Sequence, residues 1–132
     1  MHMYRTFGAE TTAKSLDGMF ACVLLDESRG EIFAARDHVG IKPLYYGKMN
    51  DGGICFASEL KSLCTVPNVT EVTEFPPGHF YTNKDGFQEF NAYPWDCENY
   101  EGWVEDEPTP EQIVETLRMS IEKRMMSDVE YG

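Results

Sequence analysis

The chain has 132 residues, a length that suits about one domain with a single modest hydrophobic core. Hydrophobic residues make up 42% of the sequence and aromatic residues 13%, which is typical of a globular protein and excludes a largely disordered one. The formal net charge of -12 argues against binding to nucleic acid or to anionic membranes. No apolar run is long enough to span a bilayer, so we expect no membrane partner.

The four cysteines form no pattern typical of a metal site. None belongs to a C-x-x-C pair, and no histidine stands at zinc-ligand spacing from any of them. Cys22 lies inside the apolar run 20–25, where we expect a buried and inert thiol. The acidic residues between positions 96 and 115 lack the spacing of a calcium loop and indicate a solvated connector. We predict that the chain binds no metal and that its cysteines are reduced, as in a cytoplasmic protein.

The first third of the chain contains one short helical signal and one hairpin. Residues 9–16 have a weak pattern for a short helical turn. Residues 19–25 are nearly all apolar, which predicts a strand buried on both faces. The polar break 26–30 contains turn-forming residues, and residues 31–35 then read as the returning strand.

Two further hairpins follow. Residues 44–46 and 54–57 flank the sequence Asn-Asp-Gly-Gly, a strong turn signal because these residues tolerate positive φ. Residues 79–82 and 87–90 flank a second turn of similar composition. Between the two hairpins we expect one helical turn that Ser58 caps.

The end of the chain has the clearest single element. Thr109 as N-cap, Pro110 at the first helical position and Gln112 completing a capping box predict the start of a helix. Apolar residues then recur four positions apart and form one stripe, which should face a partner surface. The residues of this stripe are Ile113, Val114, Leu117, Ile121 and Met125. The expected fold class is therefore α+β: antiparallel strands, a linker and one amphipathic helix.

Several segments, taken in chain order, resemble one family. The first is Leu-Asp-Gly-Met-Phe at residues 16–20, and the second is the pattern RD-x-x-G-x-x-PL-Y at residues 36–45 with ASE-x-K at residues 57–61. Both resemble class II glutamine amidotransferase domains of the N-terminal-nucleophile type. Residues 75–79 and 123–132 resemble, more narrowly, glutamine-hydrolysing asparagine synthetases.

The resemblance implies a fold and a domain division. Residues 1–93 would be the C-terminal part of an amidotransferase domain, a partial sandwich of the N-terminal-nucleophile hydrolase type. Residues 94–108 would be an acidic linker, and residues 109–132 the truncated first helix of the synthetase domain. The missing amidotransferase half and the rest of the synthetase domain would be partners of this chain. A homo-oligomer of the full-length form stays open as an alternative.

The resemblance also implies a reaction. An N-terminal cysteine hydrolyses glutamine, ammonia passes through a tunnel, and ATP with magnesium activates aspartate as β-aspartyl-AMP. The products are asparagine, glutamate, AMP and pyrophosphate. Here His2 stands where the family has its cysteine, and the residues that grip glutamine have no counterpart. We therefore assign this chain no catalytic, substrate-binding or cofactor-binding residue and expect it to be inactive alone.

Four residues remain as candidates for a loop or domain-interface role. Arg36 and Asp37 follow a predicted strand and precede Gly40, which favours a structural ion pair or a loop brace over catalysis. Ser58 and Glu59 would, by resemblance, lie near the interface that ammonia crosses, or simply cap a helix with an exposed acid.

Three interpretations of the chain stay open. It is a segment of a ligase, a non-catalytic module that docks on a partner, or a truncated gene product. Half of a two-sheet sandwich would leave on the order of 1,000 Å² of apolar surface uncovered, worth about 25 kcal/mol of lost burial. We therefore expect the isolated chain to be partly unfolded or to associate.

Overall fold

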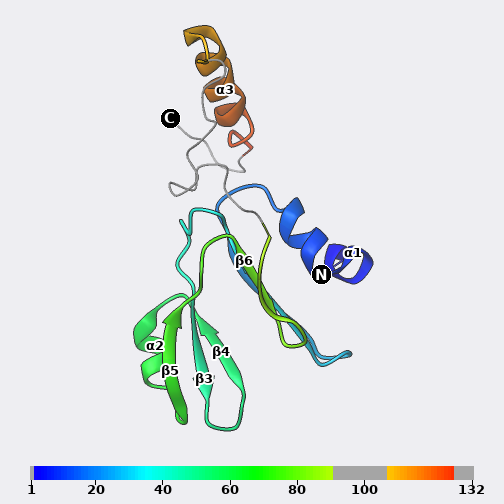
Figure 1. The fold of residues 1–132 in the computed structure, drawn as a ribbon, viewed down its shortest axis with the longest axis vertical. Helices are drawn as coiled ribbons and strands as arrows, with labels where there is room; N and C mark the ends of the chain where they lie inside the picture. Colours follow the sequence, from blue (N-terminus) through cyan, green and yellow to red (C-terminus); the bar gives the residue numbers. More distant parts are fainter. Residues whose placement is uncertain (1, 91–106, 127–132) are drawn as a thin grey trace. The chain divides into compact units, whose positions relative to one another are not determined.

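The computed structural model describes residues 2–90 and 107–126 (Figure 1). The chain divides into two compact units, Met1–Pro94 and Trp95–Gly132. The predicted acidic linker lies outside the described residues except for residues 107 and 108, and the predicted synthetase segment is described as far as residue 126. The expected α+β class with antiparallel strands and a C-terminal helix is confirmed. Among the described residues, no helix combines the length and the apolarity needed to cross a membrane.

The first unit contains a four-stranded antiparallel sheet in the order β1-β2-β6-β7. Its strands are β1 (Ala21–Asp26), β2 (Glu31–Arg36), β6 (His79–Thr82) and β7 (Gly86–Glu89). The first and third predicted hairpins supply these strands, and both turns contain a glycine with positive φ, Gly30 and Gly86. In this sheet β1 and β7 are the edges.

A three-stranded sheet in the order β4-β3-β5 is the second layer. Its strands are β3 (Tyr45–Met49), β4 (Ile54–Ala57) and β5 (Val69–Glu74), and helix α2 (Leu60–Cys64) packs against all three. The β3–β4 hairpin was predicted from its turn. Strand β5 was not predicted, because its sequence Val-Thr-Glu-Val-Thr-Glu carries exposed acids and has no Gly-rich turn beside it.

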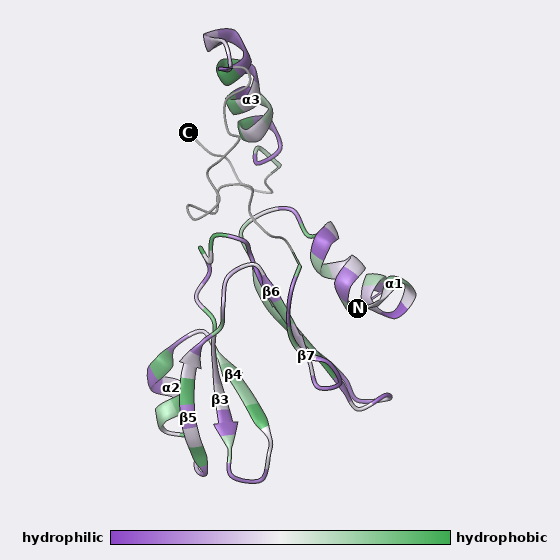
Figure 2. Ribbon diagram, in the orientation of Figure 1, coloured by the Kyte–Doolittle hydropathy of each residue, from purple (hydrophilic) through white to green (hydrophobic). Residues whose placement is uncertain are grey.

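Helix α1 (His2–Ser15) covers one face of the four-stranded sheet and is longer than the predicted turn. Gly8, with φ of 80°, interrupts it, and the Thr12 hydroxyl donates a 2.7 Å hydrogen bond to the Gly8 carbonyl. Tyr4 and Ala13 are the buried hydrophobic residues of this helix. Most other positions are exposed and polar, as the mostly purple and white ribbon of α1 shows in Figure 2, which explains the weak sequence signal.

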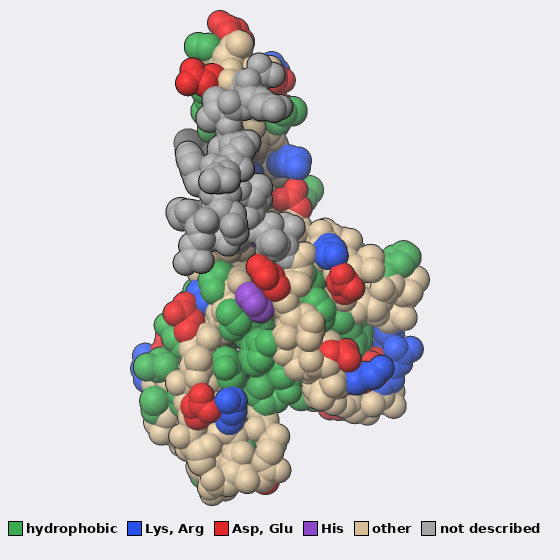
Figure 3. Space-filling view, viewed as in Figure 1, with side chains coloured by type: hydrophobic (Ala, Val, Ile, Leu, Met, Phe, Trp, Pro, Cys, Tyr) green, Lys and Arg blue, Asp and Glu red, His purple; other side chains and the backbone are tan. Residues whose placement is uncertain are grey.

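Two apolar clusters lie on opposite faces of the four-stranded sheet. One joins α1 to the sheet through Tyr4, Phe33 and Phe80, with ring centroids 5.4 and 6.2 Å apart in that order. The other joins the two sheets through Ala34 and the fully buried Phe75. In Figure 3 hydrophobic side chains gather between the two sheets, and charged side chains lie around them.

Strand β1 corrects one prediction. The apolar run does form a strand, but only Cys22 and Leu24 pack against the α1 cluster. Val23 is 46% exposed and Leu25 is 55% exposed on the opposite face. The strand is at a sheet edge, and no described element covers that part of its second face, so a continuous apolar run did not mean burial on both faces.

The cap predicted for α2 was also wrong. Helix α2 begins one residue later than expected, so that Glu59 is its N-cap, and no side chain makes the capping hydrogen bond. Ser58 therefore lies outside the capping position.

Helix α3 (Pro110–Glu122) confirms the predicted start. Gln112 N–H donates to Thr109 Oγ1 at 3.3 Å, and Thr109 N–H donates to Gln112 Oε1 at 2.8 Å, which completes the capping box. None of the residues of α3 is buried. The predicted apolar stripe is exposed, and Figure 2 shows it as hydrophobic segments along the helix.

Candidate functional site

The loop after β2 holds the densest group of buried polar side chains in the described residues, and Arg36 is its centre. The Arg36 side chain is 5% exposed. Its Nε donates to the Lys42 carbonyl at 2.8 Å, and its Nη2 donates to the Gly40 carbonyl at 2.8 Å. Nη1 donates to Glu74 Oε1 at 2.8 Å and to the Phe75 carbonyl at 2.6 Å. Arg36 therefore ties the end of the first sheet to the end of β5 in the second.

Asp37 accepts hydrogen bonds from the N–H groups of the same loop. Its Oδ1 accepts from Val39 and Ile41 at 3.1 and 3.0 Å, and its Oδ2 accepts from Lys42 at 3.2 Å. Oδ2 also accepts from Phe20 at 3.2 Å, which joins the loop to the start of β1. Burial of the carboxyl acts to raise its pKa, but these backbone N–H groups outweigh burial and lower the pKa of Asp37.

The two charges thus brace one loop from both sides. Arg36 donates hydrogen bonds to carbonyl groups of the loop, and Asp37 accepts hydrogen bonds from N–H groups of the loop. The contacts of both side chains therefore hold the loop and do not form a substrate site. Gly40 has φ of 70°, and a Cβ there would lie 2.9 Å from Pro77 Cγ and 3.0 Å from Arg36 Cζ. The loop needs glycine for its conformation and for its packing.

The structure places the other two candidates elsewhere. Ser58 and Glu59 are exposed between β4 and α2, and Glu59 forms an exposed ion pair with Lys61 at 2.7 Å. Among the interactions found in the described residues, none joins Ser58 or Glu59 to Arg36 or Asp37. The four candidates therefore do not form one site through direct contacts.

His2 and the cysteines have no arrangement for nucleophilic catalysis in the described residues. His2 is exposed at the start of α1, and its carbonyl accepts a hydrogen bond from Thr6. Cys22 is half-buried, and burial raises the pKa of its thiol, which disfavours the reactive thiolate. Cys55 donates to the Gly47 carbonyl at 3.5 Å, and Cys64 is exposed. These three cysteines are free in the part of the chain that the structure describes, and Cys97 lies outside it.

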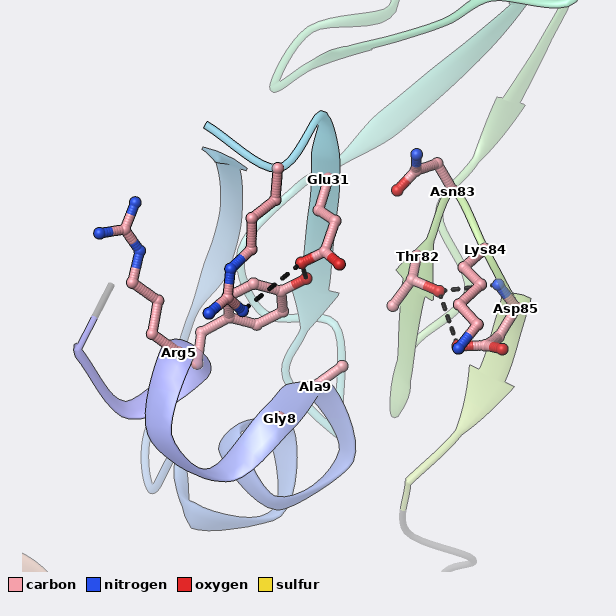
Figure 4. Close-up of a pocket in the computed structure, with 10 residues that line it drawn as sticks. Arg5, Gly8, Ala9, Glu31, Thr82, Asn83, Lys84 and Asp85 are labelled. Carbon is pink, nitrogen blue, oxygen red and sulfur yellow. Dashed lines mark hydrogen bonds and ion pairs between the residues drawn. The ribbon is translucent and has the colours of Figure 1, made fainter. Parts of the chain in front are cut away.

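A polar pocket lies between α1 and two β-turns, and the sequence analysis did not predict it (Figure 4). Its volume is about 280 Å³. Glu31 is central to one wall, where it accepts a 3.0 Å hydrogen bond from the Tyr4 hydroxyl and lies 4.0 Å from Arg29. On the opposite wall the Thr82 hydroxyl donates to Asp85 Oδ2 at 3.2 Å. Most of these polar groups bind one another, so the pocket shows no free acid–base pair for catalysis.

Arg5 extends this network away from the pocket. It donates from Nε and Nη2 to the two carboxylate oxygens of Asp26, at 2.8 and 2.9 Å. The Ser28 hydroxyl donates to the same carboxylate at 2.6 Å. Asp26 is fully buried, and the Arg5 hydrogen bonds, followed by those of Ser28, hold the pKa of Asp26 well below its ordinary value. This bidentate pair fastens α1 to the β1–β2 turn.

Comparison with known proteins assigns this arrangement to a family. Residues 1–85 match the glutamine amidotransferase domain. The glutamine-hydrolysing asparagine synthetase 3 of Arabidopsis thaliana is 39% identical over 132 residues, which cover 99% of this chain and 22% of the relative. A probable glutamine-hydrolysing asparagine synthetase of Schizosaccharomyces pombe is 38% identical, over 100% of this chain and 23% of the relative.

These matches extend beyond the amidotransferase domain. The glutamine-hydrolysing asparagine synthetase of Zea mays is 37% identical over 135 residues, which cover 99% of this chain and 22% of the relative. The chain thus spans about a fifth of the length of the curated relatives that it matches. Because the family model matches residues 1–85 and the relatives match 99–100% of the chain, the chain belongs to the class II glutamine amidotransferase domain family and is homologous over its whole length to the asparagine synthetases.

Proposed function

We propose that this chain acts as a segment of a cytoplasmic, glutamine-hydrolysing asparagine synthetase. The observation that carries the proposal is the match to asparagine synthetases across both units, at 39% identity over 99% of the chain. The amidotransferase domain alone would not favour this ligase over other glutamine-dependent enzymes. Because the match also includes α3 and the residues around it, it favours asparagine synthetase over those other enzymes.

The complete reaction has two parts that are joined by ammonia. In the first, water cleaves the side-chain amide of glutamine, which gives glutamate and ammonia. In the second, the β-carboxylate of aspartate attacks ATP and releases pyrophosphate, and ammonia then displaces AMP to give asparagine. Glutamine hydrolysis by a thiol requires a thiolate and a nearby base, and burial raises the pKa of the Cys22 thiol, which disfavours the thiolate there.

The described residues do not fit a magnesium–nucleotide site. No three side chains among the His, Cys, Asp and Glu residues of positions 2–90 and 107–126 converge on a point that could hold a metal ion. In this proposal ATP and magnesium therefore bind parts of the synthetase beyond these residues.

In this proposal the chain is a scaffold between the two reactions. Arg36 and Asp37 brace the loop that links the two sheets, and Ser58 and Glu59 are exposed candidates for an interface role. Residues 1–93 belong to the amidotransferase domain and residues 109–132 begin the synthetase domain.

The test is an activity measurement in two steps. The purified chain should release no ammonia from glutamine above the buffer blank, in the presence or absence of aspartate and Mg-ATP. A chimera in which this chain replaces the matching region of the Arabidopsis thaliana asparagine synthetase 3 should form asparagine from aspartate, glutamine and ATP. A folded chimera that neither releases ammonia from glutamine nor forms asparagine would overturn the assignment.

A second candidate is a non-catalytic module that docks on a complete synthetase. The observation that favours it is the exposed apolar stripe of α3. This alternative predicts a stable complex between the purified chain and the intact Arabidopsis thaliana asparagine synthetase 3, and an inactive chimera.

A further inference from the structure

The polar pocket between α1 and the two β-turns has no part in the proposed reaction. It has a volume of about 280 Å³ and reaches the buried side chains of Tyr4 and Thr82. Pockets that hold drug-sized molecules usually have about 300–1,000 Å³, so a ligand of this pocket would be smaller than those. The pocket therefore has room for a small metabolite.

Charges of both signs line this pocket in a chain that is otherwise acidic. The sequence has 11 lysine and arginine residues against 23 acidic residues. Three of these 11 line the pocket together with two carboxylates, and these residues are Arg5, Arg29, Lys84, Glu31 and Asp85. Figure 4 shows Glu31 on one wall and Lys84 on the opposite wall. A cation and a carboxylate thus face the same space from two sides.

Two of these charged groups keep bonding capacity that the described residues do not use. The Lys84 ammonium makes no hydrogen bond or ion pair with any described residue. Glu31 accepts the Tyr4 hydroxyl on Oε2, which also lies 4.0 Å from Arg29, while its Oε1 accepts no hydrogen bond within the described part of the chain. Arg5 already binds a carboxylate through two nitrogens. Lys84 and Glu31 Oε1 are therefore the groups that can receive a ligand.

Hydrogen bonds hold the two walls in place before any ligand binds. Asn83 Nδ2 donates to the Gly30 carbonyl at 3.0 Å, and the Ile32 N–H donates to Asn83 Oδ1 at 3.0 Å, so one side chain joins the two turns. On the helix side, Gly8 and Ala9 line the pocket with at most one methyl group each, which leaves the space between the walls open. A site with fixed walls loses less entropy when it binds a ligand.

We propose that this pocket binds a free α-amino acid with a short side chain. The carboxylate of the ligand pairs with the Lys84 ammonium, and its ammonium group pairs with Glu31 Oε1. An α-amino acid carries both charges in one small molecule, whereas a simple anion or cation would meet only one of the two groups. The site goes beyond the proposed function, because none of its residues takes part in that reaction. Its occupancy should stabilise the first unit, since the ligand joins two walls of that unit.

Isothermal titration calorimetry tests the binding with the full 132-residue chain. Glycine and L-serine should bind saturably, with a Kd that rises when sodium chloride is added, because salt screens exposed charges. Acetate and ethylamine, which each carry half of the charge pattern, should bind about threefold to fivefold more weakly, the effect of losing one exposed ion pair. No saturable binding of either amino acid, or equally tight binding of acetate or ethylamine, would overturn the proposal.

Variants test the two charged groups. Lys84→Gln and Glu31→Gln each remove one charge, and the glutamine at position 31 keeps an oxygen that can accept the Tyr4 hydroxyl. Each should raise the Kd for glycine about threefold to fivefold. Lys48→Gln and Glu71→Gln are the matched controls, because they remove the charges of an exposed ion pair in the second sheet, and they should leave the Kd unchanged. Circular dichroism checks that each variant keeps its sheets. An unchanged Kd in both pocket variants would refute the site.

Hydrogen exchange and unfolding show where the ligand binds. Saturating glycine should slow exchange in residues 29–32 and 82–86 and should raise the urea midpoint of the first unit, whereas residues 45–57 of the second sheet are the control. Protection of residues 45–57 alone would place the ligand elsewhere and refute the pocket. These assays contain no glutamine and no ATP, so their failure leaves the proposed function standing, and an inactive chimera leaves this site standing.

Discussion

At the scale of single residues, the loop after β2 shows how two neighbouring charges can be buried without pairing with each other. Arg36 satisfies carbonyl groups and a carboxylate from β5, while Asp37 satisfies backbone N–H groups. Buried charges are tolerated when their hydrogen-bonding groups are satisfied, and this loop satisfies them largely with its own backbone. The residues of the RD-x-x-G motif therefore form one hydrogen-bonded loop, in which glycine at position 40 lets the backbone lie close to the Arg36 side chain.

The contribution of close packing in this loop to the unfolding free energy can be measured with two glycine variants. Gly40 and Gly30 both have positive φ, so alanine at either position should cost about 1 kcal/mol of unfolding free energy from backbone strain. At Gly40 the new Cβ would also meet Pro77 and Arg36 at about 3 Å, whereas at Gly30 nothing lies within 4 Å. Gly40→Ala should therefore destabilise the first unit by roughly 1–3 kcal/mol more than Gly30→Ala does in urea unfolding. Equal losses would show that the close contacts carry no energy.

The Arg5–Asp26 pair should make stability depend on pH in the acid range. Its hydrogen bonds lower the pKa of Asp26 from an ordinary value of 3.8 in the folded state. The stability that follows is present above the ordinary pKa and is lost as the pH falls toward the folded-state pKa. Asp26→Asn should therefore be less stable than the wild type at about pH 5, and the difference should shrink at about pH 3. Urea unfolding at both values tests this, with about pH 6 and pH 8 as a control interval in which the difference stays constant.

At the scale of elements, turn and capping residues predicted the features that local interactions determine, namely the hairpins and the start of α3. Turn residues located all three hairpins, and Thr109, Pro110 and Gln112 located the start of α3 to the residue. Burial depends on neighbours that a local pattern does not reveal, so the apolar run at β1 was wrongly expected to be covered on both faces. Strand β5 and the pocket beside Tyr4 and Glu31 were not predicted for the same reason. The strand depends on pairing with β3, and the pocket depends on a contact between residues far apart in the sequence.

The capping box of α3 should be measurable because the helix has no buried residue to stabilise it. Helices of this length are marginal without tertiary packing, so capping should have a large share in their stability. Thr109→Ala should cost about 1 kcal/mol, or about a fivefold faster hydrogen exchange in α3. Thr116→Ala is the matched control, since the Thr116 hydroxyl only donates back to the Gln112 carbonyl within the helix. An unchanged exchange rate in the Thr109 variant would contradict a capping role in solution.

At the scale of the whole molecule, the described residues expose large apolar side chains in contiguous groups. Among the described residues fifteen large hydrophobic side chains are exposed. Single exposed residues are common, but contiguous ones mark an interaction surface. On β1 they lie on an edge strand that pairs only with β2 among the described strands, and on α3 they form a single stripe. Each unit thus presents its own apolar surface.

This surface predicts how the purified chain behaves without a partner. It should bind an anilinonaphthalene sulfonate dye strongly, because such dyes report accessible apolar clusters. Leu117→Lys with Ile121→Lys breaks the α3 stripe, and Val23→Lys with Leu25→Lys breaks the β1 face, so each pair should lower the fluorescence and both together should lower it most. Leu60→Lys removes an isolated apolar side chain and should change little. Weak dye binding by a monomer with one sharp thermal transition would mean that the two surfaces are covered within the chain, and the case for an outside partner at either would be lost.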